Sequence, residues 1–268
     1  MLERRKWNVN WPLIPQQDQP AFQSPETLLT LPMSTVTSDS ISGVSKLSLH
    51  AEYYVKRFSG QSERLKRLLG ISRFHRETRN LAYFSSKGLA TPKVVAIGEQ
   101  RIAGFPSSGV IVTAAIPDSV TLEELIQSED FYLAGRTHVR QLLEKLALAL
   151  RTLHSDGFIA RDIKTRNILV GSYHTDCTLY FFDCPSGHHP PKILLKRSII
   201  RDLAYLERGL RGHICRSDLL YLYKRYLGKD GLNAQDKALA NAALEYYSNR
   251  RMTKKRRQRA TKRHAQAS

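Results

Sequence analysis

The chain has 268 residues, of which 41% are hydrophobic and 25% charged. This composition is typical of a soluble globular protein and argues against a wholly disordered chain. The formal net charge is +18, and nine basic residues but no acidic residue lie between Arg250 and Ser268. The remaining 33 basic and 24 acidic residues leave a net charge of +9. This excess favours a polyanionic partner, which is a nucleic acid, an anionic membrane surface or a phosphorylated substrate.

The three cysteines include no C-x-x-C pair, which argues against a disulfide framework and a zinc site and favours a reducing compartment. The N-terminal residues carry positive charge without a following apolar run, so they do not resemble a secretory signal. No segment approaches the roughly 18–20 consecutive apolar residues that cross a bilayer. We therefore expect a cytoplasmic protein, whose membrane contact would be peripheral.

The first part of the chain predicts mainly strands. Residues 1–24 contain three prolines and four glutamines, which predict a mobile N-terminal arm. Three short runs between Glu26 and Phe58 predict strands, with the sequences TLLTL, STVTSDSISGVSKLSL and EYYVKRF. A helix is predicted over residues 72–87, and Gly88 ends it. Two more strands are predicted over residues 91–97 and 109–115.

The second part of the chain predicts mainly helices. Thr121 and Glu124 form the S/T-x-x-E pattern that begins a helix. Leucines at spacings of three and four predict an amphipathic helix over residues 139–154. Further helices are predicted over residues 199–210, 217–226 and 234–247, and short apolar runs lie at residues 158–159, 168–170 and 178–182. The predicted class is α+β, with an N-lobe over 25–116, a helical C-lobe over 117–249 and a basic tail over 250–268.

Three polar residues flank two of the short apolar runs. Asp162 and Asn167 lie in ARDIKTRNILV, and TLYFFD ends on Asp183. Two paired strands would bring these side chains to one edge. Mg²⁺ prefers such oxygen ligands, and a carboxylate away from the metal can accept a proton from an attacking hydroxyl. The alternative interpretation is that all three are turn formers beside short strands.

A second candidate pair combines a lysine with a glutamate. Glu77 lies on the apolar stripe of the 72–87 helix, together with Phe74, Leu81 and Phe84. A buried carboxylate needs a cation or hydrogen bonds. Lys56, which shares a strand face with Tyr54 and Phe58, is the natural partner. The alternative interpretation is a solvent-facing lysine and a glutamate at the margin of the stripe.

The order of these residues resembles the bilobal protein-kinase-like fold. The resemblance runs from about Leu28 to Tyr226. It implies that ATP and Mg²⁺ bind between two lobes, that Lys56 and Glu77 pair to hold the ATP phosphates, and that Asp162 is the catalytic base. It also implies that Asn167 and Asp183 ligate Mg²⁺.

Two further residues match the same family. Lys164 matches a lysine that contacts the transferred phosphoryl group, and Asp202 in IIRDLAYL matches an aspartate that supports the catalytic loop. Three motifs depart from the family pattern. The Gly-rich phosphate loop retains only Gly43, the usual H-R-D reads Ala160-Arg161-Asp162, and the usual D-F-G reads Asp183-Cys184-Pro185.

Within this fold, the chain resembles the bacterial lipopolysaccharide kinases, which phosphorylate heptose or Kdo in the inner core. Four segments carry the resemblance, namely RLKRLLGISRFHRETRNLAYFSSKGLATPKVVAIGE, GVIVTAAIPDSVTLEELI, RDLAYLERGL and RSDLLYLYKRYLG. The resemblance implies phosphorylation of an inner-core sugar hydroxyl at the expense of ATP. Lipopolysaccharide core and lipid A precursors would be the substrate, and residues 250–268 would contact the anionic inner-membrane surface on its cytoplasmic face.

Two alternatives remain open on the sequence. A Rio-type atypical serine/threonine protein kinase carries a metal loop similar to Asp183-Cys184-Pro185, and a basic tail would suit RNA. The second alternative is a catalytically idle kinase-fold scaffold that binds RNA through residues 250–268. Steep salt dependence of binding would identify that scaffold.

Overall fold

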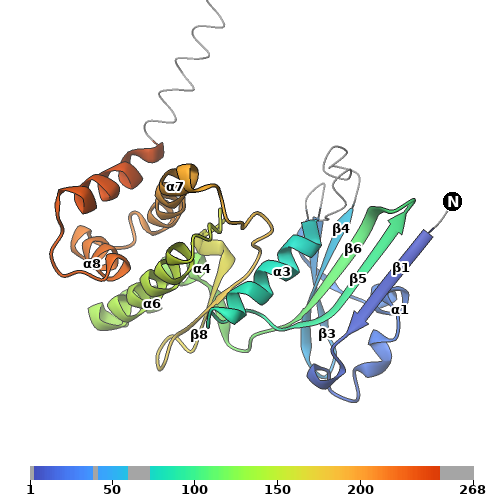
Figure 1. The fold of residues 1–268 in the computed structure, drawn as a ribbon. Helices are drawn as coiled ribbons and strands as arrows, with labels where there is room; N and C mark the ends of the chain where they lie inside the picture. Colours follow the sequence, from blue (N-terminus) through green and yellow to red (C-terminus); the bar gives the residue numbers. More distant parts are fainter. Residues whose placement is uncertain (1–2, 39–41, 60–72, 248–268) are drawn as a thin grey trace, which may run out of the picture. The chain divides into compact units, whose positions relative to one another are not determined.

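The computed structural model describes residues 3–38, 42–59 and 73–247, and Figure 1 traces its elements. The chain divides into two compact units. The first consists of residues 1–119 and 180–186, and the second of residues 120–179 and 187–268. The basic-leucine run RLKRLL and the predicted tail over 250–268 lie outside the described residues.

A six-stranded antiparallel sheet forms the centre of the first unit, with the order β1-β5-β6-β4-β3-β2. Its strands are β1 (Glu3–Val9), β2 (Ser34–Ser38), β3 (Ser42–Ser48), β4 (Glu52–Ser59), β5 (Val94–Ile102) and β6 (Phe105–Ala114). Helix α3 (Arg73–Ser86) follows the predicted helix to within one residue at each end. The run from Ser34 to Leu49, which predicts one strand, forms the two paired strands β2 and β3.

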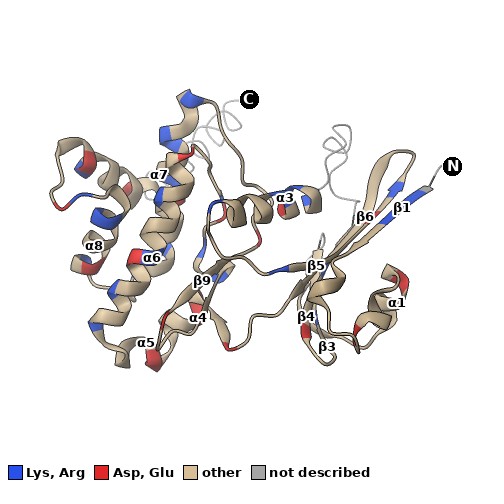
Figure 2. Ribbon diagram, turned by 60° about the horizontal axis from the view of Figure 1, so that its bottom comes forward, with Lys and Arg blue, Asp and Glu red and all other residues tan. Residues whose placement is uncertain are grey.

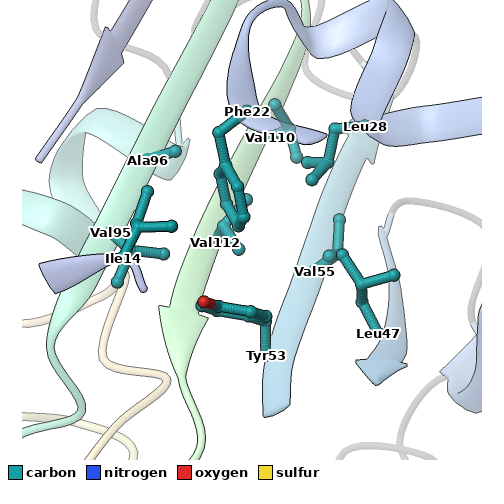
Figure 3. Close-up of a cluster of buried hydrophobic side chains, with 10 residues drawn as sticks. All are labelled: Ile14, Phe22, Leu28, Leu47, Tyr53, Val55, Val95, Ala96, Val110 and Val112. Carbon is teal, nitrogen blue, oxygen red and sulfur yellow. The ribbon is translucent and has the colours of Figure 1, made fainter. Parts of the chain in front are cut away.

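The two faces of this sheet bury different partners, because successive strand residues point to opposite sides. On one face, ten buried residues form the cluster in Figure 3: Ile14, Phe22, Leu28, Leu47, Tyr53, Val55, Val95, Ala96, Val110 and Val112. On the other face, Phe74 of α3 packs against Phe58 and Ile111. A Cβ atom at Gly109 would lie 2.6 Å from the Phe74 ring, so this close approach of α3 requires a glycine.

The N-terminal segment packs on the first of these faces, so the predicted mobile arm is wrong for its described residues. Strand β1 pairs with β5, and the turns η1 (Trp11–Leu13) and η2 (Gln19–Phe22) follow. The indole Nε1 of Trp7 donates a hydrogen bond to the Phe22 carbonyl at 2.7 Å. Phe22 and Leu28 are fully buried, so hydrophobic burial holds the segment in place.

Asp18 fastens the same segment to the β3–β4 turn. Its carboxylate is 2% exposed and accepts hydrogen bonds from the backbone N–H groups of His50 and Ala51 and from the Tyr53 hydroxyl. Burial alone would raise the pKa of Asp18, but these hydrogen bonds outweigh it and lower the pKa below its ordinary 3.8. The proline and glutamine content of residues 1–24 gives no sign of this anchor.

The strand predicted at TLLTL is also wrong, because these residues fall in helix α1 (Pro25–Thr30) and the residue after it. The Ser24 hydroxyl accepts a hydrogen bond from the backbone N–H of Thr27, and Pro25 occupies the first helical position. Both are strong signals for the start of a helix.

The second unit is mainly helical, as the sequence predicts. Its helices are α4 (Leu122–Gln127), α5 (Glu129–Leu133), α6 (Gly135–Ser155), α7 (Lys192–Leu210), α8 (Arg216–Leu227) and a helical segment over residues 234–247. The predicted capping box of Thr121 and Glu124 is present at the start of α4. No helix in the described part of the chain is long and apolar enough to cross a membrane.

A small sheet with the order β7-β8-β9 accompanies these helices. Its strands are β7 (Ser119–Thr121), β8 (Ile168–Gly171) and β9 (Thr178–Phe181), and the turn η4 (Thr165–Asn167) precedes β8. These strands place polar loop residues directly before β8 and directly after β9.

Candidate active site

Lys56 lies at the centre of a polar cluster in the first unit. Its ammonium Nζ contacts both carboxylate oxygens of Glu77 at 2.9 Å. It also contacts Oδ1 of Asp183 at 2.5 Å. The Lys56 side chain is only 14% exposed. The pairing of Lys56 with Glu77 is therefore present as the sequence predicts, and a second carboxylate joins it.

Glu77 is buried on the face of α3 that also carries Phe74 and Leu81. Burial raises the pKa of Glu77 above its ordinary value, and the nearby Asp183 carboxylate raises it further. The Lys56 ammonium opposes this rise by stabilising the charged form. The ion pair with Lys56 thus offsets only part of the desolvation cost of the Glu77 carboxylate.

The loop after β9 belongs to the first unit and is held there by two hydrogen bonds to backbone carbonyls. The Phe181 N–H donates to the carbonyl of Ala90 at 2.9 Å. The buried Asn80 amide of α3 donates to the carbonyl of Cys184 at 2.7 Å. Between these anchors, Asp183 adopts the left-handed conformation with φ of 52°, which is uncommon for a residue other than glycine. The two anchors hold the Asp183 carboxylate beside Lys56.

The loop before β8 carries the other predicted polar residues in the second unit. The Lys164 ammonium lies 2.7 Å from Oδ1 of Asp162 and 5.8 Å from the centre of the Tyr205 ring. The Asn167 amide Nδ2 donates to the Asp162 carbonyl at 3.0 Å. The Asp162 side chain is 28% exposed, so its carboxylate is accessible from solvent. The loop therefore presents a carboxylate, an ammonium and an amide together.

Asp202 of α7 supports this loop through hydrogen bonds to its backbone. Its fully buried carboxylate accepts hydrogen bonds from the backbone N–H groups of Ala160 at 2.9 Å and Arg161 at 3.2 Å. Arg161 has φ of 64°, a strained conformation that persists only where its surroundings enforce it. These contacts fix the backbone directly before Asp162, which is the support that the sequence predicts for Asp202.

A buried histidine, which the sequence analysis does not single out, lies beside Asp202. The His154 Nε2 lies 3.6 Å from Oδ2 of Asp202, and the His154 Nδ1 is 2.9 Å from the Tyr226 hydroxyl. If Tyr226 donates its proton, His154 carries its own proton on the nitrogen that faces Asp202. A histidine at the end of an apolar helix gives no indication of these partners, which are 48 and 72 residues away.

Arg201 is a second residue that the sequence analysis leaves out. Its Nε and Nη2 atoms are buried and have no hydrogen-bond partner among the described residues. Its nearest carboxylate is that of Asp202, 4.0 Å from Nε. A guanidinium with such donors is chemically suited to pair with an anionic group.

Gly43 lies on β3, paired with Ser38 of β2 and with Arg57 of β4, one residue from Lys56. A Cβ atom there would meet only the Thr37 carbonyl, at 3.8 Å, which is ordinary contact. The described backbone thus gives no steric reason for glycine at this position. Within the described residues, no group of three or more His, Cys, Asp or Glu side chains is arranged to hold a metal ion.

Comparison with known proteins identifies the family. The model of the lipopolysaccharide kinase (Kdo/WaaP) family matches residues 34–226. A solved structure described as "WaaP in complex with acyl carrier protein" has the same fold, with 20% sequence identity and a TM-score of 0.63. The alignment covers 93% of this chain and 98% of that one. No curated protein sequence matches. Since the family match spans well over half of the sequence, the chain belongs to the lipopolysaccharide kinase (Kdo/WaaP) family of ATP-dependent phosphotransferases.

Proposed function

We propose that the protein transfers the γ-phosphoryl group of ATP to a hydroxyl of heptose or Kdo in the inner core of lipopolysaccharide. The sugar oxygen forms a bond to the γ-phosphorus, and the bond from that phosphorus to the β–γ bridging oxygen breaks, which releases ADP. The Lys56–Glu77–Asp183 cluster is the observation that carries the proposal. A buried lysine between two carboxylates costs stability and is retained where its charge serves a ligand.

In the first unit, Lys56 is proposed to bind ATP phosphate oxygens. Glu77 supports this role because its two oxygens hold the ammonium in place. Gly43 and the neighbouring β3 backbone are proposed to cover the phosphates. Catalysis of phosphoryl transfer depends mainly on such positioning and on neutralising the phosphate charge.

In the second unit, Asp162 is proposed as the base that accepts the proton of the attacking hydroxyl. Lys164 is proposed to contact the transferred phosphoryl group, and its place beside Asp162 supports this role. Asp202 keeps the loop in its strained conformation through the Ala160 and Arg161 amides. Together, the three residues would orient the sugar hydroxyl toward the γ-phosphorus.

Asn167 and Asp183 are proposed to ligate Mg²⁺, which would neutralise phosphate charge. Their side chains fit this ion, because an amide oxygen and a carboxylate are the hard ligands that it prefers. The Asn167 amide nitrogen is engaged with the Asp162 carbonyl, so its oxygen faces away from that bond and suits a cation. Two protein ligands suffice, since Mg²⁺ usually completes its coordination with phosphate oxygens and water.

The proposed substrate also accounts for the charge of the chain. Core sugars lie beside carboxylates and phosphates, and a protein with a net charge of +18 would attract them. The basic residues 250–268 are proposed to contact the anionic cytoplasmic surface of the inner membrane, where the substrate is anchored. A nucleic acid would be the alternative partner of this tail.

The test combines purified protein, ATP, Mg²⁺ and lipopolysaccharide from a strain that lacks core phosphate. Mass spectrometry should detect one added phosphate on the core oligosaccharide. Asp162→Asn should fold and lose about 10²- to 10⁴-fold in rate, which is the usual contribution of a positioned base. Phosphate on protein instead of sugar would support a Rio-type kinase, and absence of both ATP binding and turnover would support the idle scaffold.

A further inference from the structure

No residue in the N-terminal half of helix α7 is fully buried. Residues 192–201, here called the α7 tip, include no buried residue, whereas six of the remaining nine residues of the helix are buried. The tip nevertheless contains five aliphatic residues: Ile193, Leu194, Leu195, Ile199 and Ile200. Ile193 is 90% exposed and Leu194 is 47% exposed. Helices in proteins are stabilised mainly by packing of an apolar face, yet Ile193 and Leu194 stay exposed among the residues that the structure describes.

The charge of the tip indicates what kind of partner it has. The tip carries the exposed cations Lys192, Lys196 and Arg197, and no acidic residue occurs between Asp183 and Asp202. Figure 2 shows these cations as blue bands on α7. The N-cap residue Pro191 offers no side-chain hydrogen bond, and the first turn contains no acidic residue. The helix dipole therefore adds to the positive charge of the side chains.

We propose that the α7 tip inserts into the surface of the anionic lipid bilayer that carries the lipopolysaccharide substrate. This inference rests on the proposed function. Exposed aliphatic side chains enter the boundary between headgroups and acyl chains, and the long side chains of Lys196 and Arg197 reach back to lipid phosphates.

The same helix connects the membrane to the catalytic loop. Ile193 and Asp202 are nine residues apart on α7, which is about 14 Å along the helix. Asp202 holds the backbone directly before Asp162 through the amides of Ala160 and Arg161. A bilayer bound at the tip would therefore set the height of Asp162 above the lipid. Inner-core sugars lie just outside the headgroups, so a fixed height of this order would present the loop to them.

Insertion is tested with a tryptophan placed at the tip. Ile193→Trp in the full-length protein is mixed with vesicles of phosphatidylglycerol and brominated phosphatidylcholine, whose bromine atoms quench tryptophan at acyl-chain depth. Leu133→Trp is the matched control, since Leu133 is 80% exposed but lies beside Glu129 and Asp130. We expect quenching of the tryptophan at 193 beyond the shared signal of Trp7 and Trp11, and none at 133. Equal quenching of both variants, or of neither, would overturn the proposal.

The contribution of charge is tested with a second pair of variants. Lys196→Gln/Arg197→Gln should weaken binding to phosphatidylglycerol vesicles about 25-fold at low salt, at about 5-fold per cation. Lys6→Gln/Lys93→Gln removes the same net charge from exposed positions of the first unit and should change binding less than about 2-fold. An equal loss in both double variants would show that only net charge matters and would contradict a contact at the tip.

Activity separates this inference from the proposed function. Ile193→Ser should phosphorylate deacylated lipopolysaccharide at the wild-type rate. On lipopolysaccharide held in vesicles, its activity should be at least about 10-fold lower, which corresponds to about 1.4 kcal/mol of binding free energy. An equal loss on both substrates would contradict the membrane role. If the wild-type protein phosphorylates neither substrate, the proposed function fails, while the quenching experiment still decides whether the tip enters the bilayer.

Discussion

At the scale of single residues, Glu77 is held in a place that disfavours its charge. Its pKa is raised above the ordinary 4.5, so the folded protein binds a proton there more tightly than the unfolded chain does. The stability that this proton contributes is fully present below pH 4.5 and is lost as the pH rises through the raised pKa. The two Glu77 oxygens nevertheless hold the Lys56 ammonium at 2.9 Å.

Glu77→Gln tests both the cost of the Glu77 charge to stability and its contribution to holding Lys56. The variant should gain stability relative to the wild type as the pH rises from 4.5 toward 8, because glutamine carries no charge to desolvate. Its kcat/KM for ATP should fall about 10- to 100-fold, the cost of losing a hydrogen bond between charged groups. Thermal unfolding across this pH range and steady-state kinetics measure both effects. Glu123→Gln, an exposed change on α4, controls for the loss of one negative charge, and parallel stability curves for Glu77→Gln and wild type would contradict the assignment.

Asp202 offers a second test at the same scale. Asp202→Asn leaves one of the Ala160 and Arg161 amides without its acceptor and should cost about 1.5–3 kcal/mol of stability. The strain at Arg161 can then relax. At temperatures well below that of unfolding, we therefore expect a lower kcat and a nearly constant KM for ATP. Asp230→Asn, at an exposed position, should change neither quantity. A loss of stability with unchanged kcat would reduce Asp202 to a structural role.

The sequence predicts which of these residues matter better than it predicts their surroundings. Lys56 and Glu77 are recognisable because a lysine on a strand and a glutamate on an apolar stripe are each out of place. Asn80 also lies on the buried side of α3, and that position is a usable signal. His154 and Arg201 give no such signal, since their significance depends on Asp202 and Tyr226, which only the folded chain brings near.

At the scale of elements, the N-terminal segment shows how a buried charge overrides composition. Proline and glutamine suggest an unstructured arm, yet β1 extends the sheet and Asp18 ties the segment to the β3–β4 turn. Similarly, the run TLLTL suggests a strand at residues 27–31, but the cap at Ser24 and the proline at position 25 favour a helix. Strands such as β4 and helices such as α6 are predicted well, because a strong period and a buried face agree.

The anchor at Asp18 is testable through the stability of the whole segment. Asp18→Ala removes the hydrogen-bond acceptor of the His50 and Ala51 amides and of the Tyr53 hydroxyl. The free energy of unfolding should fall by about 3 kcal/mol. Chemical denaturation measures the loss, and hydrogen exchange should accelerate first in β1. Since the pKa of Asp18 is lowered, its contribution is present above pH 3.8 and fades as the pH falls through the lowered pKa, so the difference from wild type should shrink in acid. Asp18→Asn keeps one acceptor oxygen, so its free energy of unfolding should lie between those of the wild type and Asp18→Ala.

At the scale of the whole molecule, half of the net charge lies in residues 250–268. A chain ending at residue 249 should bind phosphatidylglycerol vesicles at least about 10-fold more weakly, because each basic residue near an anionic surface contributes up to about 1 kcal/mol. Its kcat on deacylated lipopolysaccharide should stay at the wild-type value. Vesicle sedimentation at two salt concentrations measures the first effect. A truncated protein that binds vesicles as tightly as the full chain would leave the α7 tip as the main lipid contact.

The membership of residues 180–186 in the first unit has a consequence for how the protein can be divided. The chain passes between the two units three times, at residues 119, 179 and 186, so no single cut yields two complete units. A fragment ending at residue 119 would leave Lys56 with Glu77 alone, since Asp183 arrives from a later stretch of the sequence. Split-protein complementation and circular permutation are therefore constrained by one seven-residue loop. New termini of a permuted variant should therefore lie outside residues 180–186.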